Sequence, residues 1–144
     1  MNCVFFTDRD LGMQFPRLLA ESGLTVQRHG DLFQPEGSDE EWLEHCGRLH
    51  RVAITHNSRI RYVPNELAAL IRFRVTLLVL VLVLVGKAPT ADLAESFVRT
   101  LPRIQAMLAR LQPPAIVKVY RPSPAELSRA PETAGRVELW FPKG

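Results

Sequence analysis

Short apolar runs alternate along the chain with stretches that repeat apolar residues at helical spacing. The runs at 4–7, 26–28, 52–55 and 76–85 predict β-strands. The last run is almost entirely valine and leucine, and it is only half as long as the roughly 20 residues that cross a bilayer. It therefore predicts the central strand of a parallel sheet, covered on both faces.

Three stretches between these strands repeat apolar residues every three to four positions, which predicts amphipathic helices. The first ends near Gly23 and either begins near Pro16 or is kinked there, because proline disrupts a helix interior. The second begins at Asp39, where Ser38 and Glu41 have the spacing of a capping box. The residues expected to face inward are Trp42, Cys46 and Leu49 in the second helix, and Leu67, Leu70 and Ile71 in the third, which begins at Pro64.

The C-terminal part continues this pattern with a helix that runs from about Leu93 to Leu111 and that Pro102 breaks or kinks. Two strands with alternating polarity follow, at 115–120 and 137–141, and we expect them to pair at an edge of the sheet. The segments expected to be loops are the polar stretch 29–38 and the proline-containing, mobile stretch 121–136.

The order of these elements predicts an α/β fold with a mostly parallel sheet, flanked by helices, in a single domain over residues 1–144. A net charge of +3 permits a polyanionic partner without requiring one. Cys3 and Cys46 form no CxxC pair, so we expect reduced thiols. With no signal peptide and no membrane segment expected, the predicted location is cytoplasmic.

Ligands of parallel sheets bind beyond the carboxyl ends of the strands, so the residues that follow each predicted strand are the informative ones. Asp8 follows the first strand, Asn57 follows the third, and Asp39 opens the second helix. If these side chains converge, their oxygen atoms suit a hard divalent cation such as Mg²⁺ or Mn²⁺. Such an ion can activate a water for phosphodiester hydrolysis. Other residues at the same edge are Asp10, His56, Gly86 and Lys87.

Basic residues accompany these positions. Arg9, Arg59 and Arg61 are placed to hold RNA through its phosphates, and Tyr62 is available to stack on a base. Arginines also form ordinary solvated surfaces, so this arrangement favours RNA without requiring it.

Each candidate ligand also has a purely structural explanation. Asp8 and Asn57 are residue types that turns favour, and Asp39 complements the dipole at the start of a helix. The four histidines have no metal-ligand spacing, and only His56 lies near the predicted site. Spacing alone therefore leaves these residues as candidates.

Four segments together carry a resemblance to a known family: FFTDRDLG at 5–12, DEEWL at 39–43, ITHNSRIR at 54–61 and PNELAAL at 64–70. They resemble the VapC-related PIN-like family, from residue 3 to about residue 85. The resemblance implies a Rossmann-like PIN fold and a Mg²⁺- or Mn²⁺-dependent endoribonuclease, often the toxin of a type II toxin–antitoxin pair. It also implies an antitoxin protein, which would contact exposed arginines and the apolar tail, and a homodimer.

Carried over position by position, Asp8 matches the metal-binding acid after the first strand, and Asp39 matches the acid before the helical Trp-Leu. Asn57 stands where the family usually has Asp, and it can offer an oxygen but no charge. A charge at 4 Å contributes about 1 kcal/mol in water and about 4 kcal/mol at an effective dielectric of 20, so its loss weakens divalent binding. The other matching positions are Arg59, Arg61 and Glu66, and Asp10 or Glu66 are the acids that could compensate.

Two functions remain open from the sequence. In the first, Asp8 and Asp39 hold the ion of a ribonuclease, Asn57 completes its shell or positions water, and arginines guide RNA. In the second, a catalytically impaired PIN-like domain binds RNA or a protein. A phospho-receiver is disfavoured, because receivers need an aspartate after the third strand, where Asn57 stands.

Overall fold

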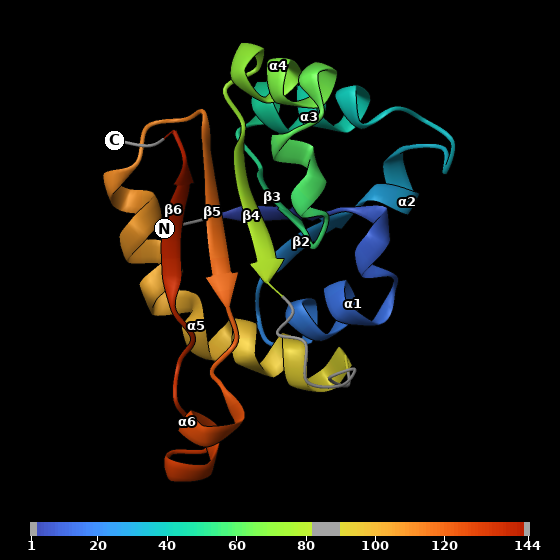
Figure 1. Ribbon diagram of the computed structural model, residues 1–144. Helices are drawn as coiled ribbons and strands as arrows, with labels where there is room; N and C mark the ends of the chain where they lie inside the picture. Colours follow the sequence, from blue (N-terminus) through green and yellow to red (C-terminus); the bar gives the residue numbers. More distant parts are fainter. Residues whose placement is uncertain (1–2, 82–89, 143–144) are drawn as a thin grey trace.

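A six-stranded sheet forms the centre of the computed structural model, which describes residues 3–81 and 90–142 (Figure 1). The strand order is β2-β1-β3-β4-β5-β6; the first five strands in the chain run parallel, and β6 is antiparallel to β5. This confirms the predicted α/β fold and its C-terminal edge pair. The strands are β1 (Val4–Thr7), β2 (Thr25–Arg28), β3 (Val52–Thr55), β4 (Thr76–Val81), β5 (Ala115–Tyr120) and β6 (Val137–Phe141). Residues 82–85 of the predicted central strand, and Gly86 and Lys87 after it, lie outside the described residues.

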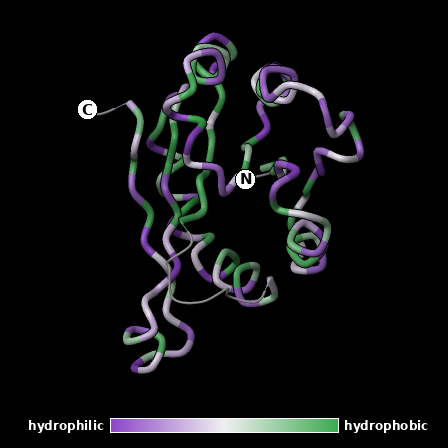
Figure 2. The backbone as a smooth tube through the Cα atoms, turned by 45° about the vertical axis from the view of Figure 1, so that its right-hand side comes forward, coloured by the Kyte–Doolittle hydropathy of each residue, from purple (hydrophilic) through white to green (hydrophobic). Residues whose placement is uncertain are grey.

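Helices cover both faces of this sheet. The apolar cluster around Phe6, Trp42 and Leu77 packs α3 and α4 on one face, and the cluster around Phe5, Phe97 and Val117 packs α1 and α5 on the other. Figure 2 shows that much of the hydrophobic colour lies along the strands between these helices. The helices are α1 (Gln14–Glu21), α2 (His29–Leu32), α3 (Asp39–Leu49), α4 (Pro64–Arg72), α5 (Thr90–Arg110) and α6 (Pro124–Arg129), with 3-10 turns η1 (Arg9–Leu11) and η2 (Ser58–Arg61).

The side chains of β4 point alternately to the two faces of the sheet, and this explains why β4 lies in the middle. Its residues 77–80 are all buried, and they divide between the two apolar clusters. A strand buried on both faces needs no polar side, which is the pattern of a covered parallel strand. Among the helices of the described residues, none is long and apolar enough to cross a membrane.

Three expectations about the N-terminal half need correction. The stretch 29–38 contains a short helix, α2, because His29 is buried against aromatic rings and Arg28 pairs with Asp31 at 2.6 Å. The capping box is wrong, since the side chain of Ser38 makes no hydrogen bond to α3. The side chains expected to face inward at Leu49 and Ile71 are each 45% exposed, because both lie in the last turn of their helices.

Proline has a smaller effect on the helices than the sequence suggested. The helix α1 begins at Gln14, so Pro16 lies in its first turn, where the missing N–H costs little. Of the two effects predicted for Pro102, a break or a kink, the break is wrong, because α5 continues through this exposed position from Thr90 to Arg110.

The stretch 121–136 is also more ordered than a loop. It contains α6, which begins with a capping box between Ser123 and Glu126. The stretch then returns to α5 at Gly135, whose N–H donates to Thr100 Oγ1 at 2.9 Å. A Cβ at Gly135 would lie 1.8 Å from the carbonyl oxygen of Tyr120, so this close approach requires glycine. The prolines of this stretch therefore belong to a folded connection between β5 and β6.

Candidate metal and phosphodiester site

A cavity of about 390 Å³ opens at the carboxyl ends of β1 and β3. The turns that follow these strands and the first residue of α3 supply its side chains, so the fold brings three distant segments together. Asp8, Asp39 and Asn57 all line it, as the sequence suggested. The other lining residues are Arg9, Asp10, His56, Ser58 and Arg59. We call this cavity the acid pocket.

Asp8 is the most buried acid of the pocket, with 8% of its surface exposed. Its N–H donates to the carbonyl of Ile54 at 2.9 Å, which continues the pairing of β1 with β3 and fixes the backbone. Its Oδ1 accepts a hydrogen bond from the N–H of Arg9 at 2.7 Å. Burial and, next, the neighbouring charge of Asp10 raise the pKa of Asp8 to about 6.

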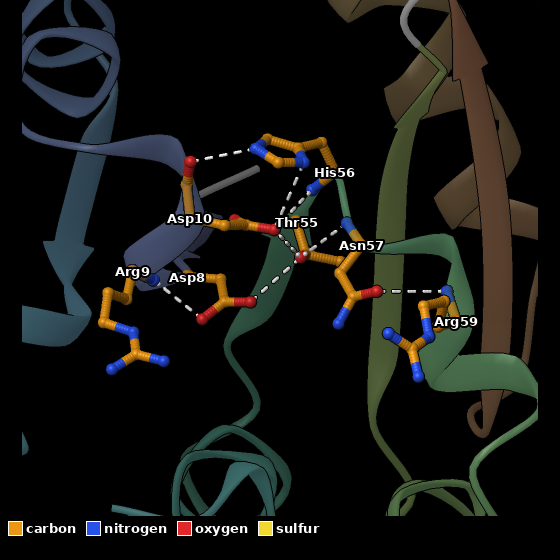
Figure 3. A network of polar contacts seen from close by, with 7 residues as sticks. All are labelled: Asp8, Arg9, Asp10, Thr55, His56, Asn57 and Arg59. Atoms are coloured by element: carbon orange, nitrogen blue, oxygen red, sulfur yellow. Dashed lines mark hydrogen bonds and ion pairs between the residues drawn. The ribbon is translucent and has the colours of Figure 1, made fainter. Parts of the chain in front are cut away.

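The hydroxyl of Thr55, the last residue of β3, joins two carboxyl groups (Figure 3). Thr55 Oγ1 lies 2.9 Å from Asp8 Oδ2 and 2.9 Å from Asp10 Oδ2, and it accepts the N–H of Asn57 at 3.0 Å. A hydroxyl has one proton to donate, so it satisfies both carboxylates only when one of them carries a proton. The raised pKa of Asp8 is consistent with such a shared proton when no cation is bound.

His56 holds Asp10 from the other side of this network (Figure 3). Its Nε2 lies 2.9 Å from the carbonyl oxygen of Asp10, and since a carbonyl only accepts, Nε2 carries the proton. The backbone N–H of His56 also donates to Asp10 Oδ2 at 3.3 Å. Thr55 and His56 thus orient the Asp10 carboxyl, which the sequence left as an auxiliary candidate.

A second pair of acids lies on the side of the pocket formed by α3 and α4. Trp42, buried in the core, donates from its indole nitrogen to Asp39 Oδ1 at 2.9 Å and orients that carboxylate. Glu66 of α4 lies against Asp39. Burial, the hydrogen bond with Asp39 and its charge together raise the pKa of Glu66 to about 7. Glu66 therefore reaches the site, and the Asp39 and Glu66 carboxyls can share one proton.

The side-chain oxygen of Asn57 is hydrogen-bonded to the backbone. Asn57 Oδ1 accepts the N–H of Arg59 at 3.1 Å and so begins η2. Figure 3 shows the amide nitrogen turned away from this bond, on the side of Asp8. The side chain therefore offers N–H donors to the pocket, whereas a metal ligand would need an oxygen there. To ligate an ion through oxygen, the amide would have to turn and release Arg59.

The carboxylate oxygens of the pocket can still ligate a hydrated hard cation. Asp8 and Asp39 line the pocket, and each of the three oxygens already bonded keeps a second lone pair. Within residues 3–81 and 90–142, no three His, Cys, Asp or Glu side chains are close enough to hold an ion together. Mg²⁺ is commonly bound by one or two carboxylates and several waters, and a cation would offset both the burial and the repulsion from Asp10 that raise the pKa of Asp8.

The predicted RNA contacts divide into two groups. Arg9 and Arg59 line the pocket. Arg9 also holds the loop before α3 in place, by donating to the carbonyl of Pro35. Arg61 and Tyr62 do not line the pocket; they lie at the far end of η2 against Trp140 of β6.

Comparison with protein families agrees with this geometry. Residues 3–81, more than half of the 144 residues, match the family model described as PIN like domain. The chain belongs to the PIN-like domain family. No curated protein and no solved structure matches it. PIN-like membership gives the chain a nuclease-like fold, and PIN domains typically bind a divalent metal.

Sequence reasoning about this PIN-like domain missed two residues that position the acids. Thr55 stands inside the motif ITHNSRIR, where a hydroxyl between a buried strand and a polar turn is a usable signal. Trp42 follows Asp39 by three residues, which places the two on the same side of α3. Its apolar periodicity identified it as core only, because periodicity does not show which way an indole N–H points.

Proposed function

We propose that this PIN-like domain is a metal-dependent endoribonuclease and a toxin-like component of a toxin–antitoxin system, related to VapC proteins. The observation that supports the proposal most strongly is the gathering of Asp8, Asp10 and Asp39 around one open cavity with Glu66 beside Asp39. Burial and, next, the neighbouring carboxyl groups raise the pKa values of Asp8 and Glu66, and perturbed groups of this kind concentrate at functional sites.

In this proposal, Asp8 and Asp39 are the residues that would hold Mg²⁺ or Mn²⁺. When bound, the ion supplies an activated water and stabilises charge on the phosphate. Thr55 and Trp42 keep the two carboxylates in place. The amide nitrogen of Asn57 donates a hydrogen bond to a phosphate oxygen or to the attacking water.

The arginines of this proposal bring the RNA to the acids. A polyanion is repelled by a cluster of carboxylates, so cations at the rim are needed to hold it there. Arg59 lies at the rim of the acid pocket, and Arg61 and Tyr62 continue from it along η2. Phosphates would be held by the guanidinium groups and a base by Tyr62.

A second candidate is a catalytically impaired PIN-like domain that binds RNA or a protein. The observation in its favour is Asn57, which brings no charge and whose oxygen is already bonded to the N–H of Arg59. The two candidates differ in one measurable property, which is divalent-dependent cleavage.

The decisive experiment compares wild type with Asp8→Ala on single-stranded RNA, with Mn²⁺, Mg²⁺ or EDTA. We expect cleavage by wild type with either ion, no cleavage in EDTA, and no cleavage by Asp8→Ala. Exposed Met13→Ala serves as the matched control and keeps full activity, because Met13 is 71% exposed and outside the acid pocket. Equal and negligible digestion by wild type and Asp8→Ala at high Mn²⁺ would exclude the nuclease and favour the second candidate.

A toxin-like role adds two proposed partners, which are a neutralising protein and a second copy of this chain. Co-expression with the product of the adjacent gene should yield a stable complex with reduced RNA cleavage. Light scattering of the purified protein should give the mass of a dimer. If the neighbouring product neither co-purifies nor inhibits cleavage, the toxin assignment fails, while the nuclease proposal stands.

A further inference from the structure

One face of the β5–β6 pair carries alternating aromatic and cationic side chains. Lys118 and Tyr120 point to the same side of β5, since they are two residues apart, while Val117 and Val119 point into the cluster packed by α5. Across from them, Arg136 stands next to Tyr120 just before β6, Glu138 of β6 is opposite Lys118, and the Trp140 ring of β6 contacts Lys118. We define the β5–β6 face as Lys118, Tyr120, Arg136 and Trp140, together with Arg61 and Tyr62, which pack on Trp140.

Cations and rings are in direct contact throughout this face. The ammonium of Lys118 lies 4.2 Å from the centre of the Trp140 ring, and the guanidinium carbon of Arg136 lies 4.1 Å from that of Tyr120. Arg61 lies 5.4 Å from the ring of Trp140, and Tyr62 meets that ring edge to face at 5.7 Å. Despite these contacts, 69% of Tyr62 is exposed to solvent. A large aromatic ring is therefore presented outward beside positive charges.

Acids neutralise only part of the positive charge of this face, since Glu138 pairs with Arg136 and lies opposite Lys118 in the strand pairing. Among the described residues, no carboxylate forms an ion pair with Arg59, Arg61 or Lys118. Glu138 is the acid of this strand pair, and it lies 3.9 Å from Arg136. The Nε of Arg61 is buried and finds no hydrogen-bond acceptor in the part of the chain that the structure describes. The face is thus complementary to a polyanion.

The face is also open, in contrast to the rest of the sheet. The apolar cluster of α3 and α4 covers this side of the sheet as far as Ile116 of β5, with Trp140 and Phe141 at its edge, and α5 lies on the opposite side of β5 and β6 (Figure 1). The turn η2 connects it to the acid pocket, because Arg59 lines the pocket and Arg61 and Tyr62 follow in the same turn.

We propose that the β5–β6 face binds unpaired nucleotides of single-stranded RNA, with a base stacked on Tyr62 and phosphates held by Arg61 and Lys118, which lie on Trp140. Stacking needs bases that are free of a duplex, and it tolerates any sequence because every base has a ring face. The proposal rests on the nuclease function for its meaning, since it gives that site a preference for single strands. Residues 115–141 lie outside the matched family segment, whereas Arg61 and Tyr62 lie within it, so this surface joins the two parts of the chain.

The test measures binding in EDTA, so that cleavage plays no part, by fluorescence anisotropy of a labelled oligoribonucleotide without self-complementarity. Tyr62→Ala should weaken binding by about tenfold, the typical loss of one base–aromatic stack. Tyr62→Phe should bind as wild type does, because it keeps the ring. Leu49→Ala, at another exposed apolar position away from the face, should leave the affinity unchanged.

Two modified probes separate stacking from simple charge attraction. Wild type should bind a strand with abasic central positions about as weakly as Tyr62→Ala binds the intact strand, and a duplex more weakly than the single strand. Lys118→Met should lower the salt dependence of binding, by a log–log slope of about 0.7 for one lost phosphate contact.

Either of two results with the wild-type protein would overturn the proposal. One is equal affinity of wild type for intact, abasic and duplex RNA; the other is no RNA binding at all, which would point to a protein partner for this face. Because divalent ions are absent, a chain that never cleaves RNA can still pass this test. Conversely, if wild type cleaves RNA and Tyr62→Ala binds RNA as tightly as wild type, the nuclease proposal stands and the proposal of an RNA-binding face is rejected.

Discussion

The acid pocket and the β5–β6 face use charge in opposite ways. In the pocket, acids crowd together and the protein gives them hydroxyl, indole and backbone N–H donors. On the face, cations lie on aromatic rings and have few acceptors. A small cation would reduce the repulsion among the acids of the pocket, and a polyanion would reduce the repulsion among the cations of the face.

In the proposed nuclease, the pocket would hold the metal ion and the face would hold the RNA. The pocket lies at the carboxyl ends of parallel strands, where turns from several segments converge on a point. The face lies on the side of an antiparallel pair, where alternate residues extend as a surface. Point-like geometry suits an ion, and an extended surface suits a chain of nucleotides. Each of the following tests changes the pocket and leaves the face intact.

The largest expected effect comes from Thr55→Val, which removes the hydroxyl between Asp8 and Asp10 while keeping the shape of the side chain. Loss of such a supporting hydrogen bond typically costs about 10- to 100-fold in metal affinity or activity. We expect this loss in Mn²⁺-dependent RNA cleavage, with unchanged RNA binding in EDTA. Thr55→Ser keeps the hydroxyl and should retain activity; if Ser is as impaired as Val, the hydroxyl is not the cause.

The next effect is on stability and follows from the pKa of Asp8, raised from 3.8 to about 6 by burial and by Asp10. Between these values the unfolded chain has released this proton and the folded chain still holds it. The free energy of unfolding therefore falls as pH rises through this window. Urea titrations in EDTA should show wild type losing about 1–3 kcal/mol relative to Asp8→Asn between about pH 4 and about pH 7.

Saturating Mn²⁺ should reverse this loss in wild type, since an ion that binds only the folded chain stabilises it. Asp8→Asn should gain little from Mn²⁺. Parallel pH profiles of the two proteins would mean that Asp8 carries no raised pKa, and the account of a crowded pocket would need revision.

The smallest expected effect is a gain, from Asn57→Asp. An aspartate can still accept the N–H of Arg59, and its second oxygen replaces the amide nitrogen on the side of Asp8. The added charge should raise Mn²⁺ affinity by about tenfold, measured by calorimetry. Ser58→Asp is the matched control, because it adds the same charge at the neighbouring pocket residue. An equal gain in both variants would show that position 57 has no special role.

The sequence predicted the pocket better than the face for physical reasons. The pocket residues stand directly after strands or at a helix start, and parallel topology forces such positions to one edge of the sheet. Asp8, Asp39 and Asn57 could therefore be placed together without coordinates. Tyr62 was identified as a base-stacking candidate, but its contact with Trp140 depends on the register of the antiparallel edge strand β6, which shifts opposite Ile116 and Val117 of β5.

Local errors in the sequence prediction share a cause. Pro102 and the stretch 121–136 were interpreted from residue preferences, and contacts with other elements contribute to both structures. Pro102 is exposed on a helix whose other side is packed, and Gly135 anchors its segment on α5. Propensity is a weak prior that packing overrides.

The central claim is that Asp8 and Asp39 hold a divalent ion in the acid pocket. Anomalous diffraction from crystals of the protein grown with Mn²⁺ tests it most directly, with Asp8→Asn crystals as the control. We predict an anomalous peak in contact with carboxylate oxygens of both aspartates in wild type and no peak in the variant. A wild-type pocket without a peak at saturating Mn²⁺, or a peak that persists in Asp8→Asn, would contradict the account.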